Sequence, residues 1–253
     1  FILYTQPLTS VILKHPVSHM LYADDTQVYK SFDLDDCLSS ILCVEKCVSD
    51  VKAWMTSNKL QMNEDKTDVL LVTAKRIVNL QHLPEFMNIN GTCVKFSPSV
   101  RNLGVTLDST LSLHQHVINV CRVAYLELRR INSIRNLLSI DAVKTLVCSL
   151  VLSRLDYCNS LLVGLPQYLI KRLQGVQNAA ARSILRTPRS EHISPLLQNL
   201  HWLPVNRRTL HKVAALCHTS LSGSGPQYLS DLTHVYTPAR SLRSSSDTRI
   251  LST

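Results

Sequence analysis

Hydrophobic and polar residues follow different patterns in the two parts of this 253-residue chain. Over the first 110 residues, short apolar runs are separated by turn-forming residues, which is typical of strands and hairpins. From about residue 111 onward, apolar residues recur every three or four positions, which is the repeat of an amphipathic helix. The pattern therefore predicts an α+β segment followed by an all-α segment.

The first segment begins with a predicted β-hairpin over residues 16–32, because β-branched and aromatic residues flank the turn Ala23-Asp24-Asp25 on both sides. A helix to about Asn58 follows it. The apolar positions of this helix step by three and four residues along the chain and are Ile41, Val44, Val48, Val51 and Met55.

Three further elements are expected before residue 110. The apolar run Val69–Ala74 predicts a short buried strand. The pair Asn90-Gly91 predicts a two-residue hairpin turn, because both residue types tolerate positive φ. The alternation over Val100–Asp108 predicts one more strand.

The second segment predicts four helices. The second of them is expected to begin at Ser139 or Asp141, the third near Pro166 and the fourth after Pro204. The residues expected to face inward on the four helices are Val117, Val120, Cys121, Ala124, Leu128 and Ile131; Val143, Leu146, Val147, Leu150 and Val151; Leu169, Leu173, Val176 and Ala180; and Val213, Ala214, Cys217 and Leu221. The chain is thus expected to consist of residues 1–110, helical residues 111–221, and a loosely ordered tail, 222–253, opened by the Ser222–Gly225 stretch.

The positive charge of the chain is concentrated in its middle. Residues 121–212 hold 14 Lys and Arg against four Asp and Glu, a net charge of +10, whereas residues 1–120 carry −2. A polyanion-binding surface predicts such an asymmetry, and a solvated basic helical surface is the alternative.

The eight cysteines form no CxxC pair and several fall on apolar helical positions, which favours a reducing intracellular compartment, nucleus or cytoplasm, over a disulfide scaffold. No apolar run approaches the ~18 residues of a membrane span, and no secretory signal precedes the hairpin. The expected protein is therefore neither secreted nor membrane-spanning.

The adjacent aspartates Asp24 and Asp25 are the candidate chemistry of the first segment. Like charges side by side in a tight turn repel each other, and a divalent cation offsets that repulsion. Carboxylates suit Mg²⁺, which typically binds one or two of them together with substrate phosphates. Two carboxylates are too few for a pair of metal ions, so a further acidic ligand would be required.

Three stretches of the chain resemble one family. The turn Tyr22-Ala23-Asp24-Asp25 resembles the YxDD turn of reverse transcriptases, and its context is similar to non-LTR retrotransposons of the LINE type, including jockey-like and chicken-repeat-type elements. "WMTSNKLQMNEDKTDVLLV", residues 54–72, resembles the next palm motif, and "VRNLGVTLDSTLS", residues 100–112, the following one. Later segments resemble the helical region after the palm, so the likeness extends from about residue 1 to 221. It implies a partial palm followed by a thumb.

The resemblance also implies roles for particular residues. Asp24 and Asp25 would be catalytic metal ligands for Mg²⁺ or Mn²⁺ in the parental enzyme, and Tyr22 with Ala23 would border the nucleotide. Lys66 would lie near the incoming triphosphate, with a solvated lysine before a strand as the alternative.

The likeness further implies that Leu103 and Gly104 would form the primer grip, for which an ordinary strand glycine is the alternative. The thumb residues implied to follow a nucleic-acid backbone are Arg122, Arg129, Arg130, Lys171, Arg172, Arg182 and Arg186.

The parental enzyme would transfer deoxynucleotides from dNTPs to a DNA primer on an RNA template. The 23 residues before Asp24 contain no acidic residue, so the first catalytic aspartate and the fingers of such an enzyme are missing from this stretch. We therefore expect this fragment alone to be inactive as a polymerase, and whether it binds either metal is left open. A sequence-indifferent nucleic-acid-binding helical module and a remnant without selected function are the alternatives.

Overall fold

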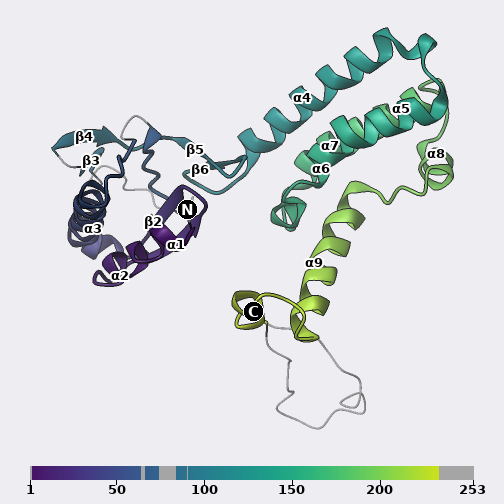
Figure 1. The fold of residues 1–253 in the computed structure, drawn as a ribbon. Coiled ribbons are helices and arrows are strands. Elements are labelled where there is room, and N and C mark those ends of the chain that lie inside the picture. Colours follow the sequence, from purple (N-terminus) through teal and green to yellow (C-terminus); the bar gives the residue numbers. More distant parts are fainter. Residues whose placement is uncertain (1, 64–65, 74–83, 90, 234–253) are drawn as a thin grey trace. The chain divides into compact units, whose positions relative to one another are not determined.

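The computed structural model describes residues 2–63, 66–73, 84–89 and 91–233. The chain divides into two compact units, residues 1–112 and 113–253, which are treated separately below. The first unit combines helices with small antiparallel hairpins and the second is helical, which confirms the α+β class (Figure 1). Across the described ranges, no helix is both long and apolar enough to cross a membrane.

The first unit contains three separate two-stranded ladders rather than one sheet. Its helices are α1 (Ile2–Thr5), α2 (Leu8–Ile12), the 3-10 turn η1 (Leu34–Asp36) and α3 (Cys37–Ser57). Its strands are β1 (Ser18–Tyr22) with β2 (Asp25–Tyr29), β3 (Phe86–Ile89) with β4 (Thr92–Lys95), and β5 (Ser99–Asn102) with β6 (Val105–Asp108).

A small apolar core holds the acidic hairpin in place. Side chains from α2 and α3 form its buried centre, and the inner face of the hairpin packs against them through Leu21 and Val28. The buried members are Leu8, Ile12, Cys47 and Val51. Because alternate residues of a strand point to opposite faces, this packing leaves the other face of the hairpin to solvent.

The helix predicted to end near Asn58 is confirmed as α3, which ends at Ser57. Its most deeply buried line differs from the predicted apolar stripe and runs through Cys37, Ser40, Cys47 and Val51. Small side chains dominate that line because α2 and β3 pack closely against α3.

The strand predictions are partly correct. The Asn90-Gly91 hairpin is confirmed by the pairing of β3 with β4, although Asn90 itself lies outside the described residues. The single strand predicted over Val100–Asp108 is wrong, because the chain reverses between β5 and β6.

The strand predicted at Val69–Ala74 is also absent from residues 66–73, and Ala74 lies outside the described residues. Two backbone hydrogen bonds, from Ser97 N to Val69 O and from Thr73 N to Ser109 O, fix this segment against the chain on either side of the β5–β6 hairpin instead.

The second unit is built of helices. They are α4 (His114–Ser133), η4 (Arg135–Leu137), α5 (Ile140–Val147), the π-helical segment η5 (Cys148–Leu152), α6 (Ser153–Asp156), η6 (Asn159–Leu162), α7 (Gln167–Leu185), α8 (Ile193–Asn199), α9 (Val205–Leu221) and α10 (Gln227–Ser230). Most of the predicted inward positions of α4, α5 and α7 are buried, and the side chain of Ser139 caps α5 by accepting a hydrogen bond from Ala142 N. The 3.6-residue repeat thus predicted these three helices correctly.

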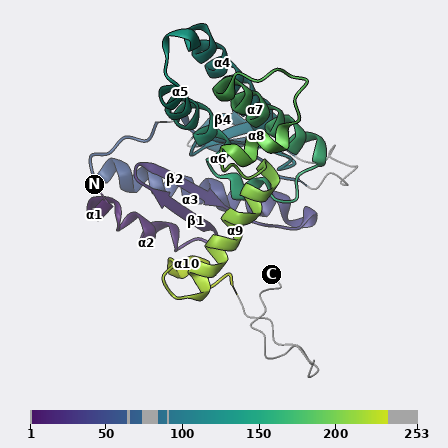
Figure 2. The same cartoon turned by 90° about the vertical axis from the view of Figure 1, so that its right-hand side faces the viewer.

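The helix α9 departs from its predicted stripe. Ala214 is exposed, whereas Val205, Thr209 and Ser220 are buried. The first half of α9 packs on η6, α6 and α7, and the second half runs away from them toward α10, so its middle has fewer neighbours (Figure 1 and Figure 2). Residues 227–230, placed in the tail by the sequence, form α10, which packs on α9.

Candidate metal and nucleic-acid site

The acidic turn connects β1 to β2 with only two residues, Ala23 and Asp24. Tyr22 pairs with Asp25 as the last rung of the ladder, so these two side chains share one face of the hairpin. That face points away from the core, since Leu21 and Val28 occupy the opposite one. Asp24 therefore lies at the tip and Asp25 immediately beside it, with both carboxylates and the Tyr22 ring exposed.

Ala23 has φ 54°, in the left-handed region. An L-residue with a Cβ costs roughly 1–2 kcal/mol there, and glycine is the usual choice. Ala23 and Asp24 form the two-residue turn, and Asp25 follows as the first residue of β2. Backbone strain of this kind clusters at functional sites, which makes the turn a reasonable candidate for one.

The residues around the turn supply only part of a metal site. The Asp24 and Asp25 side chains make no hydrogen bond or ion pair within the described ranges, so their oxygens are available to a cation. Among the residues that the structure describes, however, no group of three or more His, Cys, Asp or Glu side chains is placed to hold a metal. Two adjacent carboxylates do not fit a two-metal centre, and we assign no catalytic step to such ions.

The predicted nucleotide-contacting residues lie on this unit without forming a closed pocket. Tyr22 is 62 % exposed at the edge of the acidic turn. Lys66 is exposed, and its backbone N–H donates to Asn63 O at 3.3 Å. No hydrogen bond or ion pair found in the described residues joins Lys66 to Asp24.

The predicted primer-grip residues form a second strained turn. Leu103 and Gly104, with φ 43° and 83°, are the two residues between paired Asn102 and Val105. Positive φ at both central residues matches the right-handed twist of a two-residue hairpin. A bulky leucine is rarely found in this region, and here its side chain is 37 % exposed.

The turn after β6 is held by Asp108. Its carboxylate accepts hydrogen bonds from the backbone and side chains of Thr110 and Ser112. Burial raises the pKa of Asp108, but these hydrogen bonds outweigh it and lower the pKa to about 2. Asp108 is thus a structural carboxylate, and its oxygens are already committed.

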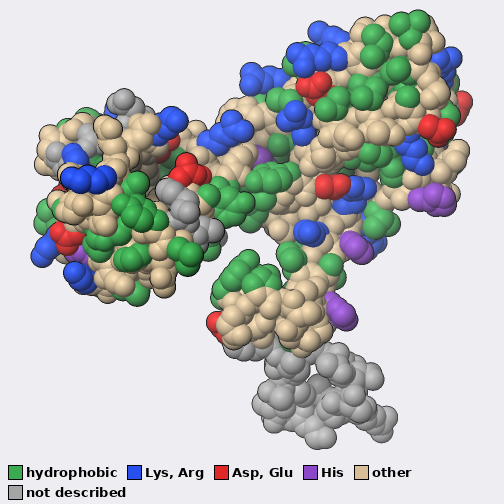
Figure 3. All heavy atoms as spheres, viewed as in Figure 1, with side chains coloured by type: hydrophobic (Ala, Val, Ile, Leu, Met, Phe, Trp, Pro, Cys, Tyr) green, Lys and Arg blue, Asp and Glu red, His purple; other side chains and the backbone are tan. Residues whose placement is uncertain are grey.

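Four of the predicted backbone-contacting cations are available on α4 and α7. Arg122 and Arg129 on α4, and Lys171 and Arg172 on α7, are exposed, and their side chains make no hydrogen bond or ion pair within the described part of the chain. Arg130 is 66 % exposed and pairs with Glu127 at 3.0 Å. Figure 3 shows Lys and Arg side chains gathered over the α4 part of this unit, with only isolated acidic side chains among them.

Arg182 and Arg186, also predicted as contacts, serve the fold instead. Arg182 donates to Pro188 O and Glu191 O, which fixes the loop after α7. Arg186 has φ 56° just past the end of α7 and donates to Arg135 O and to the Asn136 side chain. Both guanidinium groups are therefore occupied with backbone and side-chain acceptors of the chain itself.

Arg135 was not among the predicted functional residues and is the most deeply engaged cation of this unit. It is 8 % exposed and donates to Ser183 O at 3.0 Å, Ile184 O at 2.8 Å and Leu138 O at 3.2 Å. Ser183 and Ile184 belong to the last turn of α7, whose carbonyls have no partner within the helix. Arg135 thus caps α7 from almost 50 residues away, and no local pattern in the sequence could have indicated it.

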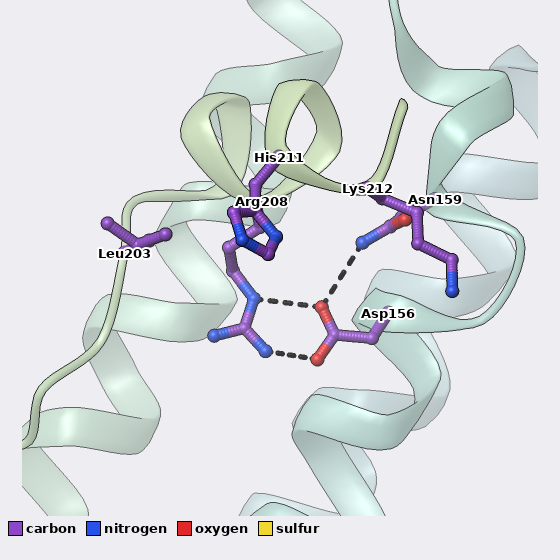
Figure 4. Close-up of a pocket in the computed structure, with 6 residues that line it drawn as sticks. All are labelled: Asp156, Asn159, Leu203, Arg208, His211 and Lys212. Atoms are coloured by element: carbon purple, nitrogen blue, oxygen red, sulfur yellow. Dashed lines mark hydrogen bonds and ion pairs between the residues drawn. The ribbon is translucent and has the colours of Figure 1, made fainter. Parts of the chain in front are cut away.

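A hollow of about 310 Å³ lies between α9 and the α6–η6 segment. Figure 4 shows Arg208 forming a bidentate ion pair with Asp156, to which the amide of Asn159 also donates. Arg208 and Asp156 are 22 % and 35 % exposed. The pair ties α9 to α6 and neutralises the carboxylate, so this hollow is a structural joint rather than a catalytic site.

Comparisons with protein-family models, with curated proteins and with solved structures gave no match.

The eight cysteines are free, and burial raises the pKa of Cys37, Cys47 and Cys121, so these thiols stay protonated near neutral pH. Among the residues that the structure describes, the acidic turn of the first unit and the basic α4–α7 surface of the second are the features considered below as ligand contacts.

Proposed function

We propose that the chain is the part of a LINE-type reverse transcriptase that extends from the middle of the palm through the thumb. The observation that carries this proposal is the acidic hairpin: a two-residue turn with strained Ala23 presents Asp24 and Asp25 together, beside an exposed Tyr22. The turn at Leu103 and Gly104 supports it, since a tight hairpin turn is what a primer grip requires. In the parental enzyme these groups would serve RNA-directed synthesis of DNA from dNTPs with Mg²⁺ or Mn²⁺.

On its own, the chain is proposed not to polymerise DNA. Its acidic turn offers two carboxylates, and a two-metal transfer requires at least one more acidic ligand. What Asp24 and Asp25 retain is a locally negative, solvent-exposed tip that is able to attract a divalent cation weakly.

Primer extension on an RNA template, with Mg²⁺ or Mn²⁺, tests this proposal. The expected result is no templated product from the wild-type chain or from the Asp24→Asn variant. A templated product that disappears in Asp24→Asn would show that the chain completes its metal site, and the inactive reading would be wrong.

A second candidate function is nucleic-acid binding without catalysis, and the four available cations of α4 and α7 favour it specifically. Each cation that neutralises a phosphate releases a counterion, so log K against log salt concentration should fall with a slope of about −0.9 per contact on duplex DNA. Four contacts predict a slope of about −3.6. Fluorescence anisotropy with a labelled duplex measures the slope, and Arg122→Gln should reduce its magnitude by about 1. Salt-independent affinity would rule out this surface as the site.

A further inference from the structure

The seam between α4 and α7 carries two half-exposed tyrosines among its cations. The helices run in the same direction, because His114 and Tyr168 meet at their first turns and Asn132 and Ser183 at their last. Tyr125 lies between these ends, with its hydroxyl only 3.2 Å from where a Cβ on Gly175 would be. Both tyrosines therefore lie along a single line of α4–α7 contacts.

Tyr168 is held at its polar end and Tyr125 lies with its hydroxyl beside Gly175, while much of each side chain stays open. The Tyr168 hydroxyl is 3.3 Å from Nδ1 of His114, and the side chain is 53 % exposed. The Tyr125 hydroxyl rests over Gly175, and its side chain is 46 % exposed. A ring fixed at one end loses little conformational freedom when a flat partner covers its face, which makes it a suitable stacking platform.

The surroundings of the tyrosines are positively charged. Arg122 and Arg129 lie one turn before and one turn after Tyr125 on α4, and Arg172 lies one turn after Tyr168 on α7. Burial raises the pKa of the Cys121 thiol on α4, and the charge of Arg172 on α7 opposes that rise. The helix α7 contains no acidic residue, and Glu127, the acidic residue of α4, is paired with Arg130, so the net charge of the two helices is positive.

We propose that this seam binds single-stranded nucleic acid, with bases stacked on Tyr125 and Tyr168 and phosphates contacting Arg122, Arg129 and Arg172. The inference rests on the proposed nucleic-acid binding and adds to it the strandedness of the ligand and the residues that detect it. A base is able to stack on a side chain only when it is free of its own helical stack, so duplex nucleic acid satisfies the cations but not the tyrosines.

The spacing along the seam suits such a ligand. Tyr168 precedes Gly175, which Tyr125 contacts, by seven residues, or about 10 Å of α-helix. That length corresponds to about three base steps of a stacked strand at about 3.4 Å each. One strand is thus able to reach both rings while its backbone follows the arginines.

The test compares labelled 16-nucleotide oligo(dT) and oligo(U) with a 16-base-pair duplex, by fluorescence anisotropy on the full chain. The variants are Tyr125→Leu and Tyr168→Leu, which keep apolar volume but remove the aromatic face. Base–aromatic stacking contributes about 1–3 kcal/mol, so each variant should weaken single-strand binding at least about fivefold. Duplex affinity should stay within about twofold, and Tyr125→Phe should behave as wild type.

Tyr228 provides a matched control, because it is 61 % exposed on α10, away from the seam. Tyr228→Leu should leave single-strand affinity unchanged. Photocrosslinking of a 5-iodouracil oligonucleotide, followed by peptide mapping, should label Tyr125 or Tyr168 in the wild-type chain and needs no variant to fold.

Two results would separate the inference from the function on which it rests. If both leucine variants bind single strands as wild type while Arg122→Gln weakens single-strand and duplex binding alike, the seam binds only backbones and the stacking inference is wrong. If no oligonucleotide binds even at low salt, the proposed nucleic-acid function fails and the inference fails with it. If oligo(dT) and oligo(U) both bind more tightly than the duplex, and by the same factor, the result supports stacking that does not depend on the sugar.

Discussion

Replacing Arg135 should test whether a buried arginine, rather than the apolar core alone, holds the end of α7 in place. The guanidinium is 8 % exposed and uses three N–H groups on three backbone carbonyls. Arg135→Met keeps an unbranched apolar stem of similar reach while removing every donor. The substitution therefore isolates the hydrogen bonds from the packing of the side chain.

The expected loss of stability follows from the number of bonds. A hydrogen bond within a protein contributes a net of about 1 kcal/mol, so three bonds to Ser183 O, Ile184 O and Leu138 O correspond to about 3 kcal/mol. The cost of removing the charged group from water is already included in such net values. Arg135→Lys keeps the charge but lacks the planar fork, and we expect it to lose about 2 kcal/mol.

Urea unfolding followed by tryptophan fluorescence measures this loss in the second unit alone. The chain has two tryptophans, Trp54 in the first unit and Trp202 in the second. In a Trp54→Phe background, Trp202 is the single reporter. With an m value of about 2 kcal/mol/M, Arg135→Met should lower the urea midpoint by about 1.5 M.

Arg122→Met is the matched control, because Arg122 is exposed on α4 and its side chain makes no described hydrogen bond. It should change the free energy of unfolding by no more than about 0.5 kcal/mol. Should Arg135→Met cost no more than Arg122→Met, the carbonyls at the end of α7 would be satisfied by water and the capping argument would be refuted.

Three further predictions concern stability. Asp108 has a pKa of about 2 in the folded chain against an ordinary 3.8. Its contribution to stability is therefore complete above pH 3.8 and is lost as the pH falls toward 2. Over this range the melting temperature of the wild type should fall more steeply than that of Asp108→Asn. Gly175→Ala gains about 1 kcal/mol of helix propensity but pushes the hydroxyl of half-exposed Tyr125 by a few tenths of an ångström, so the urea assay should show a net gain of about 0.5 kcal/mol. A double-mutant cycle of Asp156→Asn and Arg208→Met should give a coupling of about 1 kcal/mol, and additive effects would show that this ion pair does not hold α9.

The helical part of the fold could be predicted because its information is local. A helix that packs on one side must place apolar residues every three or four positions, and α4, α5 and α7 do so. The same reasoning failed for α9, where Ala214 is exposed. Periodicity indicates which face of a helix is apolar, but not whether a neighbour extends far enough to cover it.

The hairpin turns also show where prediction from a local sequence pattern succeeds and where it fails. Asn90-Gly91 signalled a hairpin because both residue types favour positive φ. Leu103-Gly104 adopts an equivalent turn, yet a leucine at φ 43° is contrary to its own preference, so alternation suggested one continuous strand. The turn at Asp24 was predicted from the β-branched and aromatic residues that flank it, whereas the strain at Ala23 became visible only in the backbone.

The number of cations available to a ligand in the second unit is smaller in the structure than the sequence suggests. The +10 of residues 121–212 suggested a broad footprint for a polyanion. Six arginines within that span donate hydrogen bonds to acceptors inside the chain and are Arg130, Arg135, Arg154, Arg182, Arg186 and Arg208. Cations bound in this way cannot release counterions from a nucleic acid, so net charge overstates the available surface.

The cations that are left to contact a nucleic acid form a smaller surface than the net charge of residues 121–212 suggests. Arg122, Arg129 and Arg172, which make no hydrogen bond or ion pair with described residues, lie on the same helices as Tyr125 and Tyr168, so attraction and stacking would act on the same strand. A salt slope near −3.6 on duplex DNA fits four contacts, whereas a slope of about −12.6 would require all 14 Lys and Arg of residues 121–212 to reach phosphate. The second value would mean that the arginines held inside the chain, Arg135 among them, leave their acceptors on binding, and neither the capping role of Arg135 nor a seam limited to α4 and α7 would then stand.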